Sequence, residues 1–165
     1  MKRLFIFILL AATICFSFPL EVIGQEGGSQ VAYEQVNPKD IRAYKFKRLK
    51  EKVVLILKLS KNKKVDYQKD LLTKRLAELV YIVVNKDEAN IEKASQRYEA
   101  SAGKLTEYVL ARDMPSRFTD VKMLMEEHKK IIEELKSSYP YHTAQYRFIV
   151  NDINSLDIYI SKLTP

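Results

Sequence analysis

The stretch from Leu71 to Val84 carries the feature that most limits how this chain folds. Its large apolar residues recur at steps of four, three and four, namely Leu72, Leu76, Leu79 and Val83. On an α-helix this spacing makes one continuous apolar stripe, which must be buried against other helices. Four further segments of similar length share the periodicity, and none alternates apolar and polar residues as a strand does. The sequence therefore predicts an all-α fold.

Five amphipathic helices are predicted from these stripes, with ranges of about 39–59, 65–85, 88–111, 117–138 and 143–163. Residues 60–64 form the first connection, and short connections of this kind favour an antiparallel up-and-down bundle. The segment from Val53 to Leu57 is apolar on every side, so we expect several neighbours to enclose the end of the first helix. The break at residues 112–116 marks a candidate seam within this bundle domain, residues 39–165.

The first 24 residues have the composition of a secretory signal peptide. Lys2 and Arg3 precede an almost unbroken apolar run from Leu4 to Phe18, and Gly24 is a suitable cleavage position. This pattern predicts a secreted or extracytoplasmic, envelope-associated protein, and an uncleaved N-terminal membrane anchor is the alternative. The only cysteine, Cys15, would leave with the signal, so the remaining chain forms no disulfide.

Residues 25–38 separate the signal peptide from the predicted bundle. They include Gly27-Gly28-Ser29 and show no sustained periodicity. Such a composition is typical of a flexible linker, so this segment is predicted to be a tether.

Motifs for catalysis or metal binding are missing from the sequence. It has no HExxH, no paired Glu-x-x-His, no GxSxG and no phosphate-binding glycine loop. His128 lies in the apolar stripe of the fourth helix, where a histidine can ligate a metal or act as a base, but it lacks motif partners. We therefore expect a buried core histidine, no enzyme activity, no cofactor and no metal. The alternative is a small-ligand or metal-binding extracytoplasmic sensor centred on His128.

Positive charge is concentrated in one region of the chain. Residues 39–64 contain eleven lysines and arginines against two acidic residues, a net charge of +9, whereas residues 65–165 carry −1. Such a patch attracts the phosphates of lipid head groups or anionic envelope polymers, although some of its cations could instead pair with acids on the next two helices. An exported protein meets little nucleic acid, so nucleic acid is not an expected partner. The expected surface-binding residues are Lys45, Arg48, Lys52, Lys58, Lys61, Lys63 and Lys64.

Three segments share a recognisable pattern, namely Tyr44 to Lys52, Leu71 to Leu79 with its Arg-Leu-Ala-Glu-Leu run, and Arg97 to Thr106. They resemble an uncharacterised family of bacterial exported helical domains. In that family a Tyr-x-x-Lys-type helix leads into a helix bearing Arg-Leu-x-Glu-Leu. The resemblance covers Tyr44 to Val109 and implies an envelope protein with a signal or anchor and no established catalytic residues.

A non-enzymatic extracytoplasmic domain that binds a protein partner or an anionic envelope surface is therefore the leading hypothesis. Arg75 and Glu78 form the expected structural polar pair, because they border the Leu71 to Val84 stripe where the first helix carries Arg48, Glu51 and Lys52. We expect Arg75 or Glu78 to form an ion pair with that helix.

Overall fold

A computed structural model describes residues 44–58 and 60–164, with side chains from Lys50 onward. All regular structure in this part of the chain is helical, as the apolar periodicity predicts. None of its helices is long and apolar enough to cross a membrane. The predicted signal peptide, the tether and residues 39–43 lie outside the described residues. In chain order the elements are α3 (Tyr44–Leu57), α4 (Lys61–Val84), α5 (Glu88–Ala111), η2 (Pro115–Arg117), α6 (Phe118–Leu135), η3 (Lys136–Ser138) and α7 (Ala144–Lys162).

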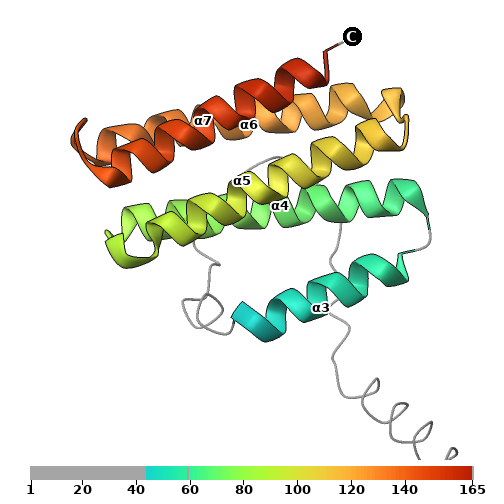
Figure 1. Cartoon of the computed structure of the whole chain (residues 1–165), viewed down its shortest axis with the longest axis horizontal. Helices are drawn as coiled ribbons and strands as arrows, with labels where there is room; N and C mark the ends of the chain where they lie inside the picture. The colour runs from blue at the N-terminus through green and yellow to red at the C-terminus, as the bar shows by residue number, and fades with distance from the viewer. Residues whose placement is uncertain (1–43, 59, 165) are drawn as a thin grey trace, which may run out of the picture. The chain divides into compact units, whose positions relative to one another are not determined.

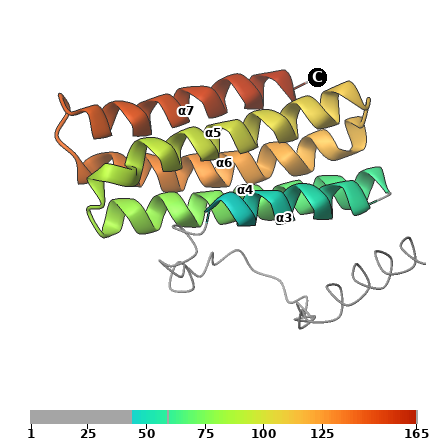
Figure 2. The same cartoon turned by 60° about the horizontal axis from the view of Figure 1, so that its bottom comes forward.

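Helices α4, α5, α6 and α7 lie alongside one another and share a single core (Figures 1 and 2). The stripe that constrains the fold is completely buried, since Leu72, Leu76, Leu79 and Val83 expose no surface. Each of the other three helices contributes its own stripe to the same interior, and the largest of these buried side chains are Ile91, Tyr98, Leu105, Met125, Ile132, Ile149 and Leu156. Mutual burial of four amphipathic faces therefore accounts for the core.

A glycine allows α5 and α7 to approach closely. Gly103 is buried, and a Cβ atom added to it would lie 2.9 Å from the hydroxyl oxygen of Tyr159 on α7. A glycine inside a helix costs about 1 kcal/mol relative to alanine. Here the missing side chain leaves room for the Tyr159 ring.

The C-terminal end of α4 is closed by backbone hydrogen bonds that turn the chain sharply. After α4, the amide of Asp87 donates to the carbonyl of Ile82 (3.0 Å) and that of Lys86 donates to Val83 (3.1 Å). Lys86 adopts the left-handed conformation, with φ of 53°. This is a Schellman motif, and it allows the three residues Asn85 to Asp87 to connect α4 to α5.

Helix α3 lies outside the shared core. None of its described side chains is buried, and Val53, Ile56 and Leu57 are 47%, 72% and 70% exposed. The expectation that several neighbours enclose the end of this helix is therefore wrong. The four following helices already cover one another's apolar faces, and α3 lies outside their shared core, with Val54 and Leu55 partly buried.

The predicted turn at residues 60–64 is mostly helical. Ser60 has an extended backbone (φ −78°, ψ 134°) and precedes the first residue of α4, Lys61. The amide of Lys64 donates to the carbonyl of Ser60 (3.1 Å), so the helix starts four residues earlier than the apolar periodicity indicates. Lys61, Lys63 and Lys64 therefore belong to the first turn of α4 and not to a loop.

Candidate functional site

The predicted surface-binding residues lie on α3, directly after it and in the first turn of α4. Lys45 and Arg48 lie within α3, but the structure does not describe their side chains. The ammonium of Lys58 lies 5.0 Å from the centroid of the Tyr67 ring. Lys61 and Lys63 are exposed and form no ion pair with any side chain that the structure describes.

The outer face of α3, defined here as Val53, Ile56 and Leu57, is an exposed apolar row. Lys50 and Lys52 are also exposed, and at 3.6 residues per turn they fall on opposite sides of this row. Apolar residues bracketed by lysines on one helix face are typical of helices that lie at a lipid interface. The sequence correctly predicts an apolar segment at the end of this helix, but the prediction that other helices enclose it is wrong.

A chain of ion pairs fastens the inner side of α3 to the bundle. Arg75 Nη2 on α4 lies 2.5 Å from Glu51 Oε2 on α3, and Arg75 Nη1 lies 2.7 Å from Glu78 Oε1. Glu78 Oε2 in turn lies 3.7 Å from Arg97 Nη1 on α5. Arg75 and Glu78 are almost completely buried, so three helices are joined by charges that are largely removed from water. The Arg75 to Glu51 pair is the contact with the first helix that the sequence analysis anticipates.

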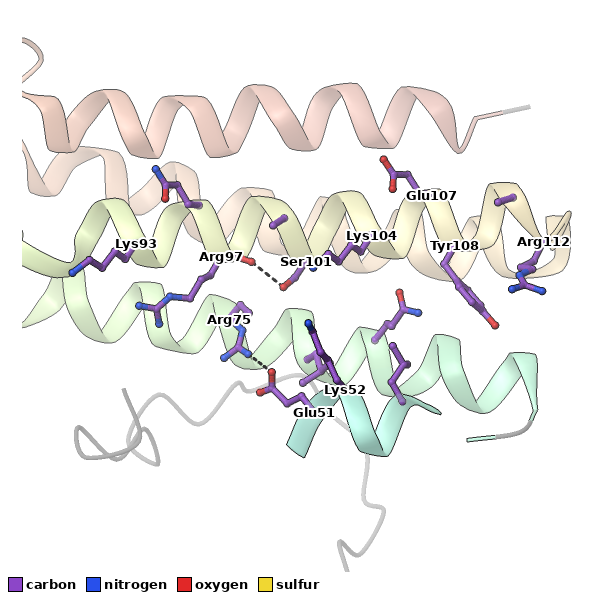
Figure 3. A pocket seen from close by; sticks show the side chains of 16 residues that line it. Glu51, Lys52, Arg75, Lys93, Arg97, Ser101, Lys104, Glu107, Tyr108 and Arg112 are labelled. Carbon is purple, nitrogen blue, oxygen red and sulfur yellow. Dashed lines mark hydrogen bonds and ion pairs between the residues drawn. The ribbon is translucent and has the colours of Figure 1, made fainter. Parts of the chain in front are cut away.

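A groove of about 790 Å³, called the cationic groove below, runs between α3, α4 and α5. Figure 3 shows Lys93, Arg97, Lys104 and Arg112 following one another along α5, while Lys52 reaches in from α3. The groove is lined by six basic side chains, which are Lys52, Arg75, Lys93, Arg97, Lys104 and Arg112.

Only two acidic side chains, Glu51 and Glu107, line the same groove. Glu51 is already paired with Arg75, and in Figure 3 the carboxylate of Glu107 points away from the α3 wall. Lys93 and Lys104 are exposed and form no ion pair with any described side chain. The groove therefore presents a net positive surface to whatever enters it.

The basic residues of α5 that line this groove were not predicted from the sequence. Lys93, Arg97 and Lys104 recur at steps of four and seven, which places them on one helix face, and that spacing was a usable signal. The contribution of α3 could not be found in this way, because the groove depends on where α3 packs.

Buried polar side chains form a second cluster inside the bundle. The ring of His128 is 2% exposed, with Nδ1 3.2 Å from the Tyr98 hydroxyl and Nε2 3.5 Å from the Thr73 hydroxyl. A neutral imidazole has one donor and one acceptor, so it can satisfy both hydroxyl contacts. Burial lowers the pKa of His128 to about 4, which keeps the ring neutral at physiological pH.

Asp152 on α7 is the least expected member of the core. It is completely buried, and the nearby Ser95 hydroxyl is the one described group that lowers the pKa of its carboxyl. The hydroxyl of Ser95 donates to the carbonyl of Phe148 (3.4 Å). Burial raises the pKa of the Asp152 carboxyl to about 7. Its position three residues after Ile149 places it on the core face of α7, which the sequence could have shown.

No group of three or more His, Cys, Asp or Glu side chains among the described residues could hold a metal ion. Both ring nitrogens of His128 already face hydroxyl groups. The chemical features that remain are two surfaces, the outer face of α3 and the cationic groove.

Comparison with known proteins identifies the family. No curated protein and no solved structure matches the chain. Residues 35–141, about two thirds of the chain, match one family of domains, and this range includes α3, α4, α5 and α6 but ends before α7. The chain therefore belongs to the family described as a domain of unknown function, DUF5667.

Proposed function

We propose that this chain is an exported, non-enzymatic helical domain that binds an anionic envelope surface through the head groups of anionic lipids. The outer face of α3 and the exposed lysines around it form the contact. In this proposal residues 1–24 direct export, and successive helices run antiparallel, because three residues are enough to connect Val84 to Glu88.

The exposed apolar row on α3 is the observation that carries the proposal. Transfer of a valine, leucine or isoleucine side chain from water is worth about 1.5–3 kcal/mol when burial is complete, so three partly exposed side chains supply about 3–5 kcal/mol. Each lysine close to an anionic lipid surface adds about 1 kcal/mol. Together these contributions support reversible, salt-sensitive binding after the costs of association are subtracted.

The arrangement of charge favours a lipid surface over a protein partner. Lys50 is exposed beside the row, and its long stem allows the ammonium group to reach head groups while the row enters the interface. The next exposed lysines, Lys61 and Lys63, lie at the start of α4, close to the end of α3.

We do not extend the proposal to a sensor centred on His128. The ring is buried in the core, and its two nitrogens lie within hydrogen-bond distance of Tyr98 and Thr73. A ligand at this position would have to displace one of these contacts.

Vesicle co-sedimentation tests the proposal. The whole core lies between Val65 and Leu163, so a chain that begins at Gln25 retains it and lacks the apolar N-terminal run. This chain is mixed with phosphatidylcholine vesicles, with or without phosphatidylglycerol. The apolar test variant combines Ile56→Gln with Leu57→Gln, and its control is Ile158→Gln, which changes a 54% exposed isoleucine on α7. The charge variant combines Lys61→Gln with Lys63→Gln.

We expect binding to require phosphatidylglycerol and to fall in both test variants but not in the control. Binding that is equal in the apolar variant and in the unmodified chain would remove the outer face of α3 from the contact. Equal binding to neutral vesicles would contradict the role of the lysines.

A further inference from the structure

The cationic groove is elongated, and its charges are spread along its full length. From Lys93 to Arg112 the α5 wall covers 19 residue steps, or about 28 Å at 1.5 Å per residue. Lys52 contributes a positive charge from the opposite wall on α3. A ligand with a single anionic head would therefore leave several cations covered by an uncharged tail, which is unfavourable. This distribution favours a partner with several anionic groups in a row.

The floor of the groove is apolar. Leu71 from α4, Leu55 from α3, and Ala100 and Ala111 from α5 line the groove beside its charged side chains. A highly hydrated polymer of phosphate groups gains nothing from such a floor. A partner helix with one apolar stripe can bury that stripe against it while acidic residues on both flanks meet the lysines.

From this combination we infer that the cationic groove is a docking site for an acidic amphipathic helix of a partner protein. The docked helix lies along α5, and its length matches the groove at about 18 or 19 residues, since both helices rise 1.5 Å per residue. Lys52, Lys93 and Lys104 supply positive charge that no ion pair with a described side chain neutralises. Arg75 and Arg97, which are held by the ion pairs to Glu51 and Glu78, fix the position of the walls.

This inference concerns a different surface from the lipid contact. The outer face of α3 points away from α4, whereas the groove lies between α3 and α5. The two proposals can therefore fail independently, and a substitution on the outer face of α3 serves as a control here.

Binding of synthetic peptides to the chain from Gln25 tests the inference. The probe is a peptide of about 19 residues with leucines at helical i, i+3, i+4 and i+7 spacing and glutamates on the flanks. One control peptide has the same composition in an order without a stripe, and polyglutamate is the second. Affinity is measured by fluorescence anisotropy, with the label on the peptide, at two salt concentrations.

Two variants examine the groove directly. Lys93→Gln combined with Lys104→Gln removes two exposed charges from its α5 wall, and the matched control is Lys130→Gln, an exposed lysine on α6. Ala100→Gln places a longer, uncharged side chain in the middle of the groove. Ile56→Gln with Leu57→Gln changes only the outer face of α3.

We expect the striped peptide to bind more tightly than either control probe and to weaken as salt rises. The double lysine variant should lose affinity roughly three- to tenfold, because each exposed charge contributes modestly. Ala100→Gln should also weaken binding, while Lys130→Gln and the α3 variant leave it unchanged. Equal binding of polyglutamate or of the unstriped peptide would indicate a general polyanion site and overturn the inference. Absence of binding by the striped peptide, or binding unaffected by the groove variants, would overturn it as well.

Discussion

Replacing Glu51 with glutamine should release α3 from the bundle while leaving the four-helix core folded. The inner side of α3 is held by the half-buried Val54 and Leu55 and by the ion pair from Glu51 to Arg75. Fully burying an aliphatic side chain is worth about 1.5–3 kcal/mol, so two half-buried ones contribute about 1.5–3 kcal/mol in total. The ion pair is thus a large part of what keeps α3 docked.

The expected loss follows from the burial of the pair. Arg75 and Glu51 expose 5% and 16% of their side chains, and Arg75 keeps its second contact with Glu78 in the variant. A hydrogen bond to a charged group contributes about 1.5–3 kcal/mol when largely buried, and the retained contact with Glu78 reduces the net loss to about 1–2 kcal/mol. A loss of this size raises the open fraction of α3 by about 5- to 30-fold.

Hydrogen exchange followed by mass spectrometry measures this change helix by helix. In Glu51→Gln the amides of α3 should exchange faster by that factor, while those of α4, α5, α6 and α7 keep their protection. The control is Glu133→Gln, which removes an exposed partner of Lys129 and should alter nothing in α3. Unchanged exchange in α3, or an equal loss of protection throughout the bundle, would refute the reasoning.

Three further predictions concern the core. Asp152→Asn should stabilise the protein more at pH 8 than at pH 4. The pKa of native Asp152 is raised to about 7, so the unmodified protein loses roughly 1–4 kcal/mol of stability as pH rises from about 4 through 7. Chemical denaturation that gives the same stability difference at both pH values would contradict this prediction. Leu76→Ala should cost about 2–5 kcal/mol, because Leu76 is completely buried, whereas Leu57→Ala should change stability by less than about 0.5 kcal/mol; similar losses in urea denaturation would place α3 in the core. Gly103→Leu should lower stability by about 1–3 kcal/mol through collision with Tyr159, and an unchanged melting temperature would show that this contact yields easily.

The sequence was sufficient to predict the helices of the core, because their stripes recur at helical spacing and their partners are one another. Leu72 and Leu76 had to be buried for the chain to fold at all, and they are. The stripe of α3 has the same spacing, yet Ile56 and Leu57 remain exposed. Periodicity shows that a helix has an apolar face, but it does not show whether the rest of the chain has room to cover that face.

The candidate surfaces were predicted only in part, for a related reason. The charge of residues 39–64 indicated a basic region, but the local sequence did not show that Lys52 would face Lys93 and Lys104 across a groove. That arrangement depends on the buried ion pair of Arg75 with Glu51, which fastens α3 to α4 and is not visible in the local sequence. Asp152 was overlooked because its neighbours make an ordinary amphipathic stripe, although its position on the core face was visible.

The contact between α3 and lipid is the central claim, and one fluorescence measurement tests it most directly. The chain contains no tryptophan, so Ile56→Trp introduces a single probe on the outer face of α3, and Ile158→Trp provides the matched probe on α7. When vesicles containing phosphatidylglycerol are added, emission from position 56 should shift to shorter wavelength and be quenched by brominated acyl chains, while emission from position 158 stays unchanged. The claim would be contradicted if the protein bound the vesicles while the tryptophan at position 56 kept the emission of an exposed tryptophan.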